Sequence, residues 1–316
     1  MIGGSGALRS GKIRGLDRRS TSTALWPGHL VAFAFAVTML GTTLPTPLYP
    51  IYEQRIGFSS FMVTVVFAVY ALGVIVALLL VGRLSDDVGR RPVLLAGLAL
   101  SAASALLFLL AGGLPLLFAG RVLSGLSAGV FTGTATATLL DLAPPDRRGR
   151  ATLIATAANM GGLGCGPLLA GFLAQYAPLP VRLCFIVDLV LVAAAITGLA
   201  RIPETVEHRS RGRLRLEGLR IPTGARALFV RSATAAFAGF AVLGLFTAVA
   251  PAFLGQVLKL PDHALTGAVV FAVFAASLAG QVALEHTTPR VALPAGCLYL
   301  QHEWARRKLG RTGEPD

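Results

Sequence analysis

Two ionised side chains lie deep inside otherwise apolar stretches of this 316-residue chain, and they are the residues best suited to chemistry. Arg121 lies about six residues, or roughly 9 Å at helical rise, inside the stretch 115–140, and Asp188 lies about as deep in the stretch 182–201. A charge at the centre of a bilayer costs at least about 2.5–3.5 kcal/mol on insertion scales, so such residues usually serve a function. Their opposite signs and equal depth allow an ion pair, which would offset part of that cost. Arg121 is a candidate for contacting a substrate or modulating a proton site, and Asp188 for gaining and losing a proton; a purely structural pair is the alternative.

The elements that hold these two residues are predicted to be membrane-spanning helices. Hydrophobic residues make up 54% of the chain, charged residues 14%, and the mean hydropathy is +0.71, whereas ordinary soluble domains carry roughly 25% charged residues. About 20 apolar residues cross a bilayer as a helix, and the runs are continuous rather than alternating, which favours helices over strands. The predicted fold class is all-α, a polytopic membrane bundle. Eight spans are expected at 29–50, 61–82, 92–112, 115–140, 151–175, 182–201, 230–254 and 264–284.

The net charge of +13 is explained by membrane topology rather than by nucleic acid. If the first span leaves the cytoplasm, 24 of the 28 Lys and Arg residues fall on cytoplasmic segments, as the positive-inside rule requires. These residues are dispersed over separate loops without interleaved aromatics, which argues against nucleic-acid binding. The basic segment 1–28 is expected to be a disordered cytoplasmic tail, and the apolar run after it is too long for a cleaved signal peptide. The expected location is the plasma (inner) membrane, with the N-terminus in the cytoplasm.

A charged segment separates the second and third apolar stretches. It reads Gly82-Arg83-Leu84-Ser85-Asp86-Asp87-Val88-Gly89-Arg90-Arg91-Pro92. So many ionised side chains cannot lie in hydrocarbon, so a short cytoplasmic turn is predicted here. Asp86 and Arg90 stand four residues apart, and Asp141 ends the fourth stretch on the same side of the membrane, so these side chains can form a charge cluster. A solvated turn that only fixes topology is the alternative.

The order of glycine, leucine, aspartate, glycine and paired arginines in this segment resembles the signature loop between the second and third spans of the major facilitator superfamily. The resemblance extends from about Leu30 to about Leu300 and implies a secondary transporter without a soluble catalytic domain. In that family the equivalents of Asp86 and Arg90 hold the two halves together in the outward-open state, which implies a gating role for Gly82, Asp86, Gly89, Arg90, Arg91 and Asp141.

Other motifs extend the resemblance. Arg121-Val122-Leu123-Ser124-Gly125 resembles the family's fourth-span motif, whose arginine is linked to proton coupling, and Gly166-Pro167-Leu168-Leu169-Ala170-Gly171 partly resembles the fifth-span motif of antiporters. Pro45, Pro47 and Pro50 resemble a further motif of drug and proton antiporters, and Pro203-Glu204-Thr205 ends the sixth span as is common in the family. The resemblance thus implies proton-coupled export of a small or drug-like molecule, with lipid and protons as the other partners.

Small residues repeat along two of the predicted spans. Gly125, Gly129 and Gly133 recur every four residues, which favours close approach of a second helix over the nucleophile elbow that Gly-x-Ser-x-Gly marks in hydrolases. Gly162 and Gly166, with Ala170, form a second stripe, and Pro167 predicts a kink. A dinucleotide loop is not favoured there, because no strand precedes it and proline removes a backbone donor. The expected helix-packing residues are Gly125, Gly129, Gly133, Gly162, Gly166, Pro167 and Gly171.

The expected organisation is one full transporter half and part of a second. It comprises a tail at 1–28, a six-helix half at 29–203, a basic linker at 204–229, an incomplete half at 230–300 and a polar tail at 301–316. Twelve spans are usual in the family, so a C-terminally truncated transporter is expected. Alternating access needs both halves, so the isolated chain is expected to insert without driving efflux. A non-transporting membrane fragment, inert or associated with another transporter, is the rival hypothesis.

No enzyme, cofactor or metal is expected. The chain shows no convergent nucleophile and base, and Cys165, Cys184 and Cys297 form neither a C-x-x-C pair nor a metal-ligand spacing with the histidines. These cysteines are expected to be ordinary buried small residues. Substrate identity and oligomeric state stay open.

Overall fold

A computed structural model of the chain describes residues 25–202, 204, 224, 226–259 and 262–283. Within these residues every regular element is helical and no strand occurs. The long helices are α1 (Leu25–Thr43), α3 (Ser60–Val88), α4 (Arg90–Leu109), α5 (Leu114–Leu142), α6 (Arg148–Tyr176), α7 (Leu183–Leu199), α8 (Arg226–Ala252) and α9 (His263–Ala283). The short elements are η2 (Thr46–Leu48), α2 (Tyr49–Ile56), η3 (Pro145–Arg147) and η5 (Phe253–Val257). The all-α prediction is confirmed.

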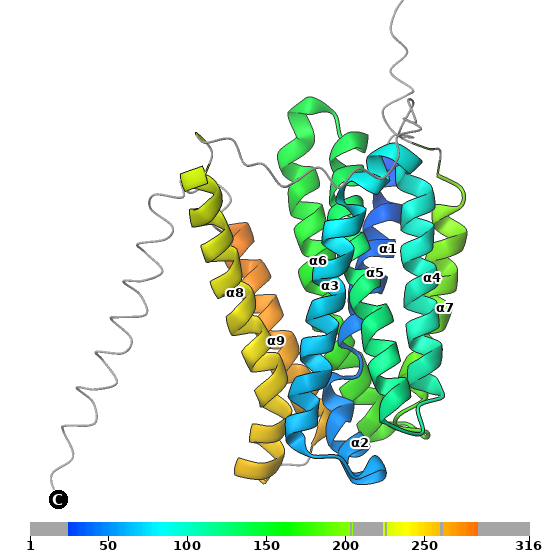
Figure 1. Cartoon of the computed structure of the whole chain (residues 1–316), viewed down its shortest axis with the longest axis vertical. Coiled ribbons are helices and arrows are strands. Elements are labelled where there is room, and N and C mark those ends of the chain that lie inside the picture. The colour runs from blue at the N-terminus through cyan, green and yellow to red at the C-terminus, as the bar shows by residue number, and fades with distance from the viewer. Residues whose placement is uncertain (1–24, 203, 205–223, 225, 260–261, 284–316) are drawn as a thin grey trace, which may run out of the picture.

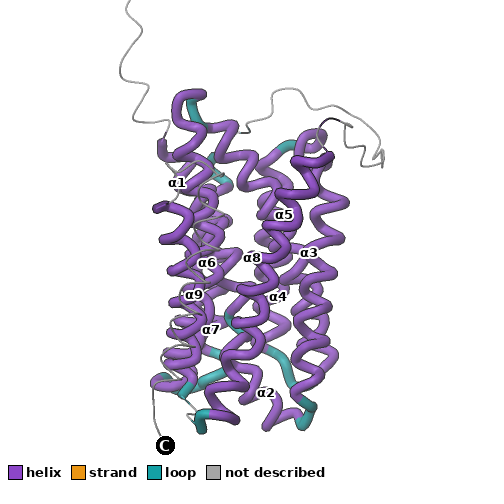
Figure 2. The backbone as a smooth tube through the Cα atoms, turned by 90° about the vertical axis from the view of Figure 1, so that its left-hand side faces the viewer, coloured by secondary structure: helices purple, strands orange, loops and turns teal. Residues whose placement is uncertain are grey.

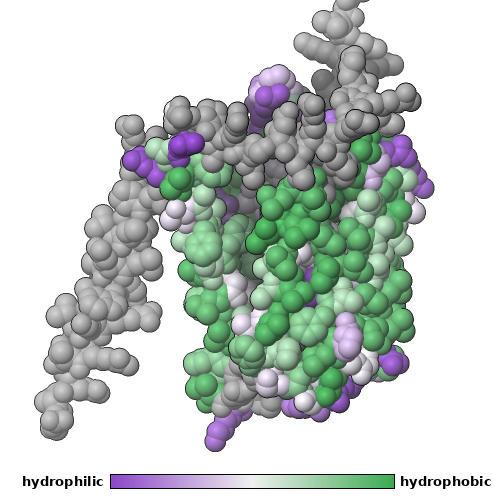
Figure 3. Space-filling view, viewed as in Figure 1, coloured by the Kyte–Doolittle hydropathy of each residue, from purple (hydrophilic) through white to green (hydrophobic). Residues whose placement is uncertain are grey.

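The helices agree with the expected membrane spans. Seven segments of the described chain are long and apolar enough to cross a bilayer, and α7, with 17 residues, is a shorter apolar helix that occupies the predicted sixth span. Hydrophobic residues cover most of the face of the bundle seen in Figure 3. The exposed large apolar side chains include Leu72 and Leu79 of α3 and Phe237 of α8. An exposed surface of this kind is stable in lipid and not in water.

Proline residues divide the first span. The span from Pro27 to Ile56 is not one helix, because α1 ends at Thr43 and η2 and α2 follow it. Pro45 immediately precedes η2, and Pro50 lies in the first turn of α2, where the missing N–H costs no helical hydrogen bond. The backbone is therefore irregular between α1 and α2, and Tyr49 and Tyr52 of α2 lie in the protein interior.

The predicted turn from Gly82 to Pro92 is wrong in extent. Helix α3 continues through this segment to Val88, and α4 begins at Arg90, so that Gly89 alone links them. Charged residues do not end a helix that has left the membrane, since its backbone groups remain hydrogen-bonded within the helix. The break occurs at Gly89 because its φ of +113° is a conformation that other residues rarely adopt.

Helices α1 and α3 to α7 form one bundle, and α8 and α9 lie beside each other along one side of it (Figures 1 and 2). Helix α1 packs against α5, α6 and α7, while α4 lies between α5 and α7. Helix α9 packs along α6. Helix α8 is exposed over its first half and buries Thr247 and Ala250 only near its C-terminal end, so it approaches the bundle at the end that carries α2.

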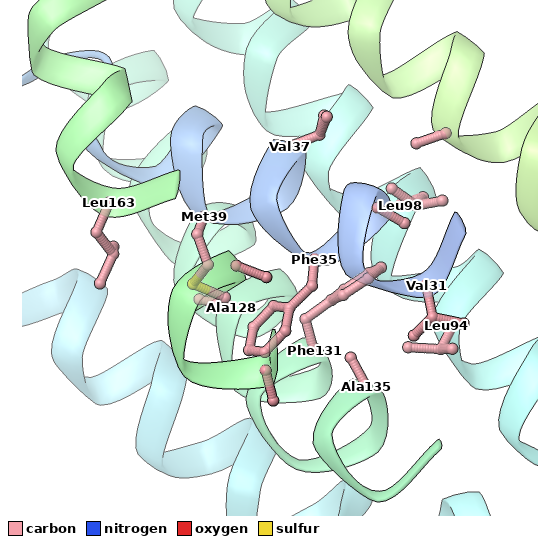
Figure 4. Close-up of a cluster of buried hydrophobic side chains, with 14 of the residues drawn as sticks. Val31, Phe35, Val37, Met39, Leu94, Leu98, Ala128, Phe131, Ala135 and Leu163 are labelled. Carbon is pink, nitrogen blue, oxygen red and sulfur yellow. The ribbon is translucent and has the colours of Figure 1, made fainter. Parts of the chain in front are cut away.

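The core of the bundle is apolar and is centred on α1. Val31, Phe35 and Met39 lie on successive turns of α1 and belong to one buried cluster with Leu98 of α4 and Phe131 of α5 (Figure 4). The Phe35 and Phe131 rings lie 6.3 Å apart between centroids. In a membrane such contacts contribute through close packing, because lipid tails are as apolar as the core itself.

Most of the predicted packing glycines lie at close helix crossings. A β-carbon at Gly125 would overlap the Tyr70 carbonyl oxygen of α3, and one at Gly129 would lie 2.6 Å from both the Ala77 Cβ and the Val74 carbonyl oxygen. Gly133 is different, since the nearest atom, in Leu78, would be 4.0 Å away. The first two glycines therefore bring α5 and α3 into backbone contact, and Gly133 does not.

Small residues of helix α6 contact two neighbouring helices, α1 and α9. Gly162 and Gly166 meet backbone carbonyl groups of α1, and a β-carbon on either residue would overlap them. Gly171 meets the His263 carbonyl oxygen at the start of α9 in the same way. Pro167 lies inside α6, which continues from Arg148 to Tyr176. Gly162 and Gly166 thus allow α6 to approach α1 closely, and Gly171 allows it to approach α9.

Candidate transport site

Arg121 is buried inside the bundle, with 1% of its surface exposed. Its Nε donates a hydrogen bond to the Tyr49 hydroxyl at 2.5 Å, and its Nη1 donates one to the Thr42 carbonyl oxygen at 2.6 Å. Both partners lie in the first predicted span, on α2 and α1. Hydrogen bonds from a charged donor are the stronger kind, so they fix the guanidinium against these two elements.

Aromatic rings surround the same guanidinium group. Its central carbon lies 5.2–5.7 Å from the ring centroids of four residues, Tyr49, Phe67, Tyr70 and Phe108. Cation–π attraction contributes most where the cation is removed from water. The Arg121 Nη2 atom nevertheless has no hydrogen-bond partner among the described residues. The site therefore stabilises a buried cation and leaves one of its donor groups free to bind another molecule.

Asp188 is equally buried, at 1% exposure, and lies against α1 from α7. A β-carbon built on Gly41 would lie 2.9 Å from its Oδ2, so only a glycine leaves room for the carboxylate there. Its Oδ1 has no hydrogen-bond partner among the described residues. A buried carboxylate without a partner is costly when ionised.

The structure does not bring Arg121 and Asp188 into an ion pair. Both residues are described, yet no salt bridge within 4.0 Å joins them. Instead each contacts α1 at neighbouring positions, since Asp188 packs on Gly41 and Arg121 binds the carbonyl of Thr42. The expected direct pair is therefore absent from this conformation, because Arg121 is turned towards Tyr49 and the aromatic rings.

A second group of charges lies at the opposite end of the bundle from α2, where α3 meets α4. Arg90 Nε forms a salt bridge of 3.0 Å with Asp141 Oδ2, and the Arg90 backbone N–H donates to Glu204 Oε1 at 2.9 Å. Arg91 donates to the Ala200 carbonyl oxygen just beyond α7. The sequence placed Arg90 and Asp141 on one side of the membrane, and the structure brings them into contact.

Glu204 was not among the predicted site residues. Its carboxylate packs on Gly89, where a β-carbon would lie 2.6 Å from Oε2. The only sequence signal was its place in Pro203-Glu204-Thr205 after the sixth span. The surroundings of Gly82 and of the Asp86 side chain lie outside the described part of the structure, and the gating role of these two residues stays a prediction. In the part of the chain that the structure covers, no three His, Cys, Asp or Glu side chains lie close enough to share a metal ion.

The fold and its buried charges define a polytopic helical protein of the transporter class. A sequence model of the Major Facilitator Superfamily matches residues 31–300, and the chain belongs to this superfamily. The resemblance inferred from the motifs, over about Leu30 to Leu300, is thereby confirmed.

Relatives of this chain include the MdtD proteins of Escherichia coli (strain K12 / DH10B) and Shigella boydii serotype 18, both named as candidate multidrug resistance proteins. Each is 30% identical to this chain over 158 residues, which are 50% of this chain and 33% of the relative. The aligned region thus spans a third of the length of these relatives. Among solved structures, the human organic anion transporter MFSD10 (TETRAN) matches with a TM-score of 0.59 and 20% identity, covering 85% of this chain and 74% of that one. That similarity shows a shared fold.

Proposed function

We propose that this chain works as a proton-coupled secondary transporter that exports small, drug-like molecules by alternating access. Membership of the superfamily and the similarity to MdtD support transport of such molecules. The observation that carries the proton coupling is the Asp188 carboxylate, which is buried, unpartnered and packed on α1 at Gly41. The plasma membrane, with the N-terminus in the cytoplasm, is the proposed location, because that orientation puts most arginines on the inside.

The mechanism follows from the contacts of α1. When Asp188 is protonated, it is neutral and its burial against α1 costs little. When it loses the proton, the negative charge favours water or a cation, so α1 and α7 shift relative to each other. Because the Thr42 carbonyl binds Arg121, the same shift changes the position of the guanidinium group. A substrate that binds the free Nη2 of Arg121 would then be coupled to the proton on Asp188.

The charges at the Gly89 end are proposed to stabilise one of the two conformations. Arg90, Asp141 and Glu204 connect α4, α5 and the segment after α7. Asp86 and Gly82 are proposed to extend this cluster, as the family resemblance implies. Rigid-body rocking of one half against the other would break such contacts and form them again in each cycle.

The test is transport by the purified full chain in proteoliposomes with an acidic lumen. The proposal predicts that the pH gradient drives uptake of the fluorescent dye Hoechst 33342, with matching proton release, and such uptake would replace the expectation, drawn from the sequence, that the chain inserts without driving efflux. Asp188→Asn and Arg121→Ala should each lower the initial rate about tenfold, equivalent to about 1.4 kcal/mol of barrier. Arg182→Ala is the matched control, since Arg182 is an exposed cation just before α7. Dye uptake at the same rate with and without the pH gradient would refute the coupling of transport to protons. No uptake by well-folded protein would favour a membrane component that acts by associating with another transporter.

A further inference from the structure

We propose that Tyr52 relays protons between Asp188 and the end of the bundle that carries α2, through water molecules held between the two side chains. The inference rests on the proposed proton-carrying role of Asp188. Tyr52 lies in α2 with 2% of its surface exposed, and its hydroxyl has no hydrogen-bond partner among the described residues. The same is true of Asp188 Oδ1. Folded proteins rarely leave buried polar groups unpaired, and internal water commonly pairs with those that protein atoms do not reach.

Cys184 connects the two unpaired groups. It lies one helical turn before Asp188 on α7, fully buried, and belongs to the same side-chain cluster as Tyr52. Cys184 and Asp188 are both buried and stand four residues apart on α7, so their side chains lie on the same face of that helix. Arg55, one turn beyond Tyr52 on α2, is exposed. The order from the surface inwards is therefore Arg55, Tyr52, Cys184 and Asp188.

The other direction along α7 offers no such route. Beyond Asp188, towards the Gly89 end, the buried residues of α7 are Val192, Ala195 and Leu199, all apolar. They pack in the apolar core with α1 and α4. A proton cannot pass along side chains that neither donate nor accept hydrogen bonds. The only polar approach to Asp188 along α7 is thus from the α2 end, which is the outer side in the proposed topology.

The remaining ionisable groups near Asp188 do not compete for this role. Apart from Cys184, the neighbouring elements present Tyr49 and Tyr52 from α2 and Arg121 from α5, and Tyr49 is engaged because its hydroxyl accepts a hydrogen bond from Arg121. Helices α1 and α4 carry ionisable side chains only near their far ends, and α6 carries Cys165 in its middle. The residues at those far ends are His29, Arg90 and Arg91.

A tyrosine hydroxyl can both donate and accept a hydrogen bond, which a relay requires. In the proposed step, a hydronium ion at the outer end passes a proton to the Tyr52 oxygen while the phenolic proton moves to the water on the inner side. That water passes a proton to the Asp188 carboxylate. Tyr52 is neutral before and after the step, and the reverse sequence returns the proton. No oxidant or other reactant is needed.

The first test measures how fast the proton on Asp188 exchanges with solvent, which does not require transport. Purified full chain in lipid nanodiscs is transferred from H₂O to D₂O, and infrared difference spectra follow the carbonyl stretch of the protonated carboxyl group, assigned by its loss in Asp188→Asn. We expect Tyr52→Phe to slow this exchange about tenfold. Tyr176→Phe, which removes a hydroxyl from an exposed tyrosine at the end of α6, should exchange at the wild-type rate.

The outcomes separate the relay from the proposed function. If no carboxyl band disappears in Asp188→Asn at any pH, Asp188 holds no proton and both ideas fail. If the band is present and Tyr52→Phe exchanges as fast as wild type, the relay is overturned while the role of Asp188 stands.

A second measurement keeps Tyr52 in place, in case Tyr52→Phe does not fold. Cys165→Ser and Cys297→Ser leave Cys184 as the single thiol, and Ag⁺ is added to one side of sealed vesicles. The fraction of Cys184 that stays free is then counted with a maleimide after denaturation. We expect Ag⁺ to react from the α2 side about tenfold faster than from the Gly89 side. Equal rates, or faster reaction from the Gly89 side, would overturn the route.

Discussion

The hydrogen bond between Thr43 and the backbone of α6 offers a sharp test of the packing. Pro167 has no backbone N–H, so the carbonyl of Leu163, four residues earlier, loses its usual helical donor. The Thr43 hydroxyl of α1 donates to that carbonyl oxygen at 2.9 Å. Carbonyl oxygens of α1 itself, in Met39 and Leu40, lie farther away, at 3.4 and 3.3 Å. A single hydroxyl proton therefore satisfies a group that the proline has left unpaired.

The perturbation is Thr43→Val, which keeps the side-chain shape and removes the hydroxyl. Hydrogen bonds between membrane helices contribute about 0.6 kcal/mol on average and at most about 1.7. A buried carbonyl left without any donor adds to the cost, so we expect Thr43→Val to lower the free energy of unfolding by about 1–2 kcal/mol. In a Pro167→Ala background the new N–H of residue 167 can bond Leu163 within α6. In that background Thr43→Val should lower the free energy of unfolding by only a few tenths of a kcal/mol. The difference between the two backgrounds, about 1 kcal/mol, is the coupling energy between positions 43 and 167.

The assay is a double-mutant cycle on unfolding in mixed detergent and denaturant micelles, followed by circular dichroism. Thr38→Val is the matched control. Thr38 is a fully buried threonine of the same helix, and its hydroxyl donates at 2.9 Å to Ala34 in α1 itself. Thr38→Val should lower the free energy of unfolding by the same amount whether residue 167 is proline or alanine. Equal costs of Thr43→Val in the two backgrounds would refute the reasoning, because Thr43 would then not compensate for the proline.

Further predictions concern packing, the turn and topology. Gly125→Ala should lower the melting temperature by several degrees, because a β-carbon there overlaps α3. Gly133→Ala should be neutral or stabilising, because Gly133 has room for a β-carbon and alanine favours a helix over glycine by up to about 1 kcal/mol. Equal shifts of the melting temperature in the two variants would contradict the close crossing of α3 and α5. Gly89→Ala should reduce the yield of folded protein, measured by size-exclusion chromatography, because its φ is +113°; a wild-type yield would show that the link tolerates a side chain. Single cysteines at Asp87 and Arg213 should stay unlabelled by an impermeant maleimide in intact cells, and labelling of either would overturn the topology.

The number and position of the helices could be predicted from the sequence because one physical length governs them. About 20 apolar residues are needed to cross a bilayer, and each predicted span coincides with a helix or, in the first span, with the broken helices α1 and α2. The residues at which the helices end were less predictable, because the thickness of the hydrocarbon core does not determine where a helix ends once it has entered water. Helix α3 therefore extends to Val88, six residues beyond its predicted span, until a glycine conformation breaks it.

The candidate site could be predicted in part, for a similar reason. Charge in an apolar run reveals Arg121 and Asp188 directly, because few other residues are so costly in a membrane. Their partners are neutral, and nothing in their own sequence distinguishes Tyr49 or Tyr52 from other tyrosines. Gly41, which makes room for Asp188, is one of 36 glycines. Such contacts depend on how separate helices pack, which one-dimensional spacing does not contain.

The same limit explains why a direct pair of Arg121 and Asp188 was an attractive expectation. Depth in the membrane follows from spacing along each span, but the rotation of each helix about its axis does not. The structure places α1 as the element that both residues contact, at the neighbouring positions Thr42 and Gly41. A proton on Asp188 can therefore influence Arg121 without touching it, through the backbone of one helix. The proposed transport cycle fits this arrangement better than a closed ion pair, because Oδ1 of Asp188 and Nη2 of Arg121 each lack a hydrogen-bond partner among the described residues, which leaves them available for the proposed proton and substrate.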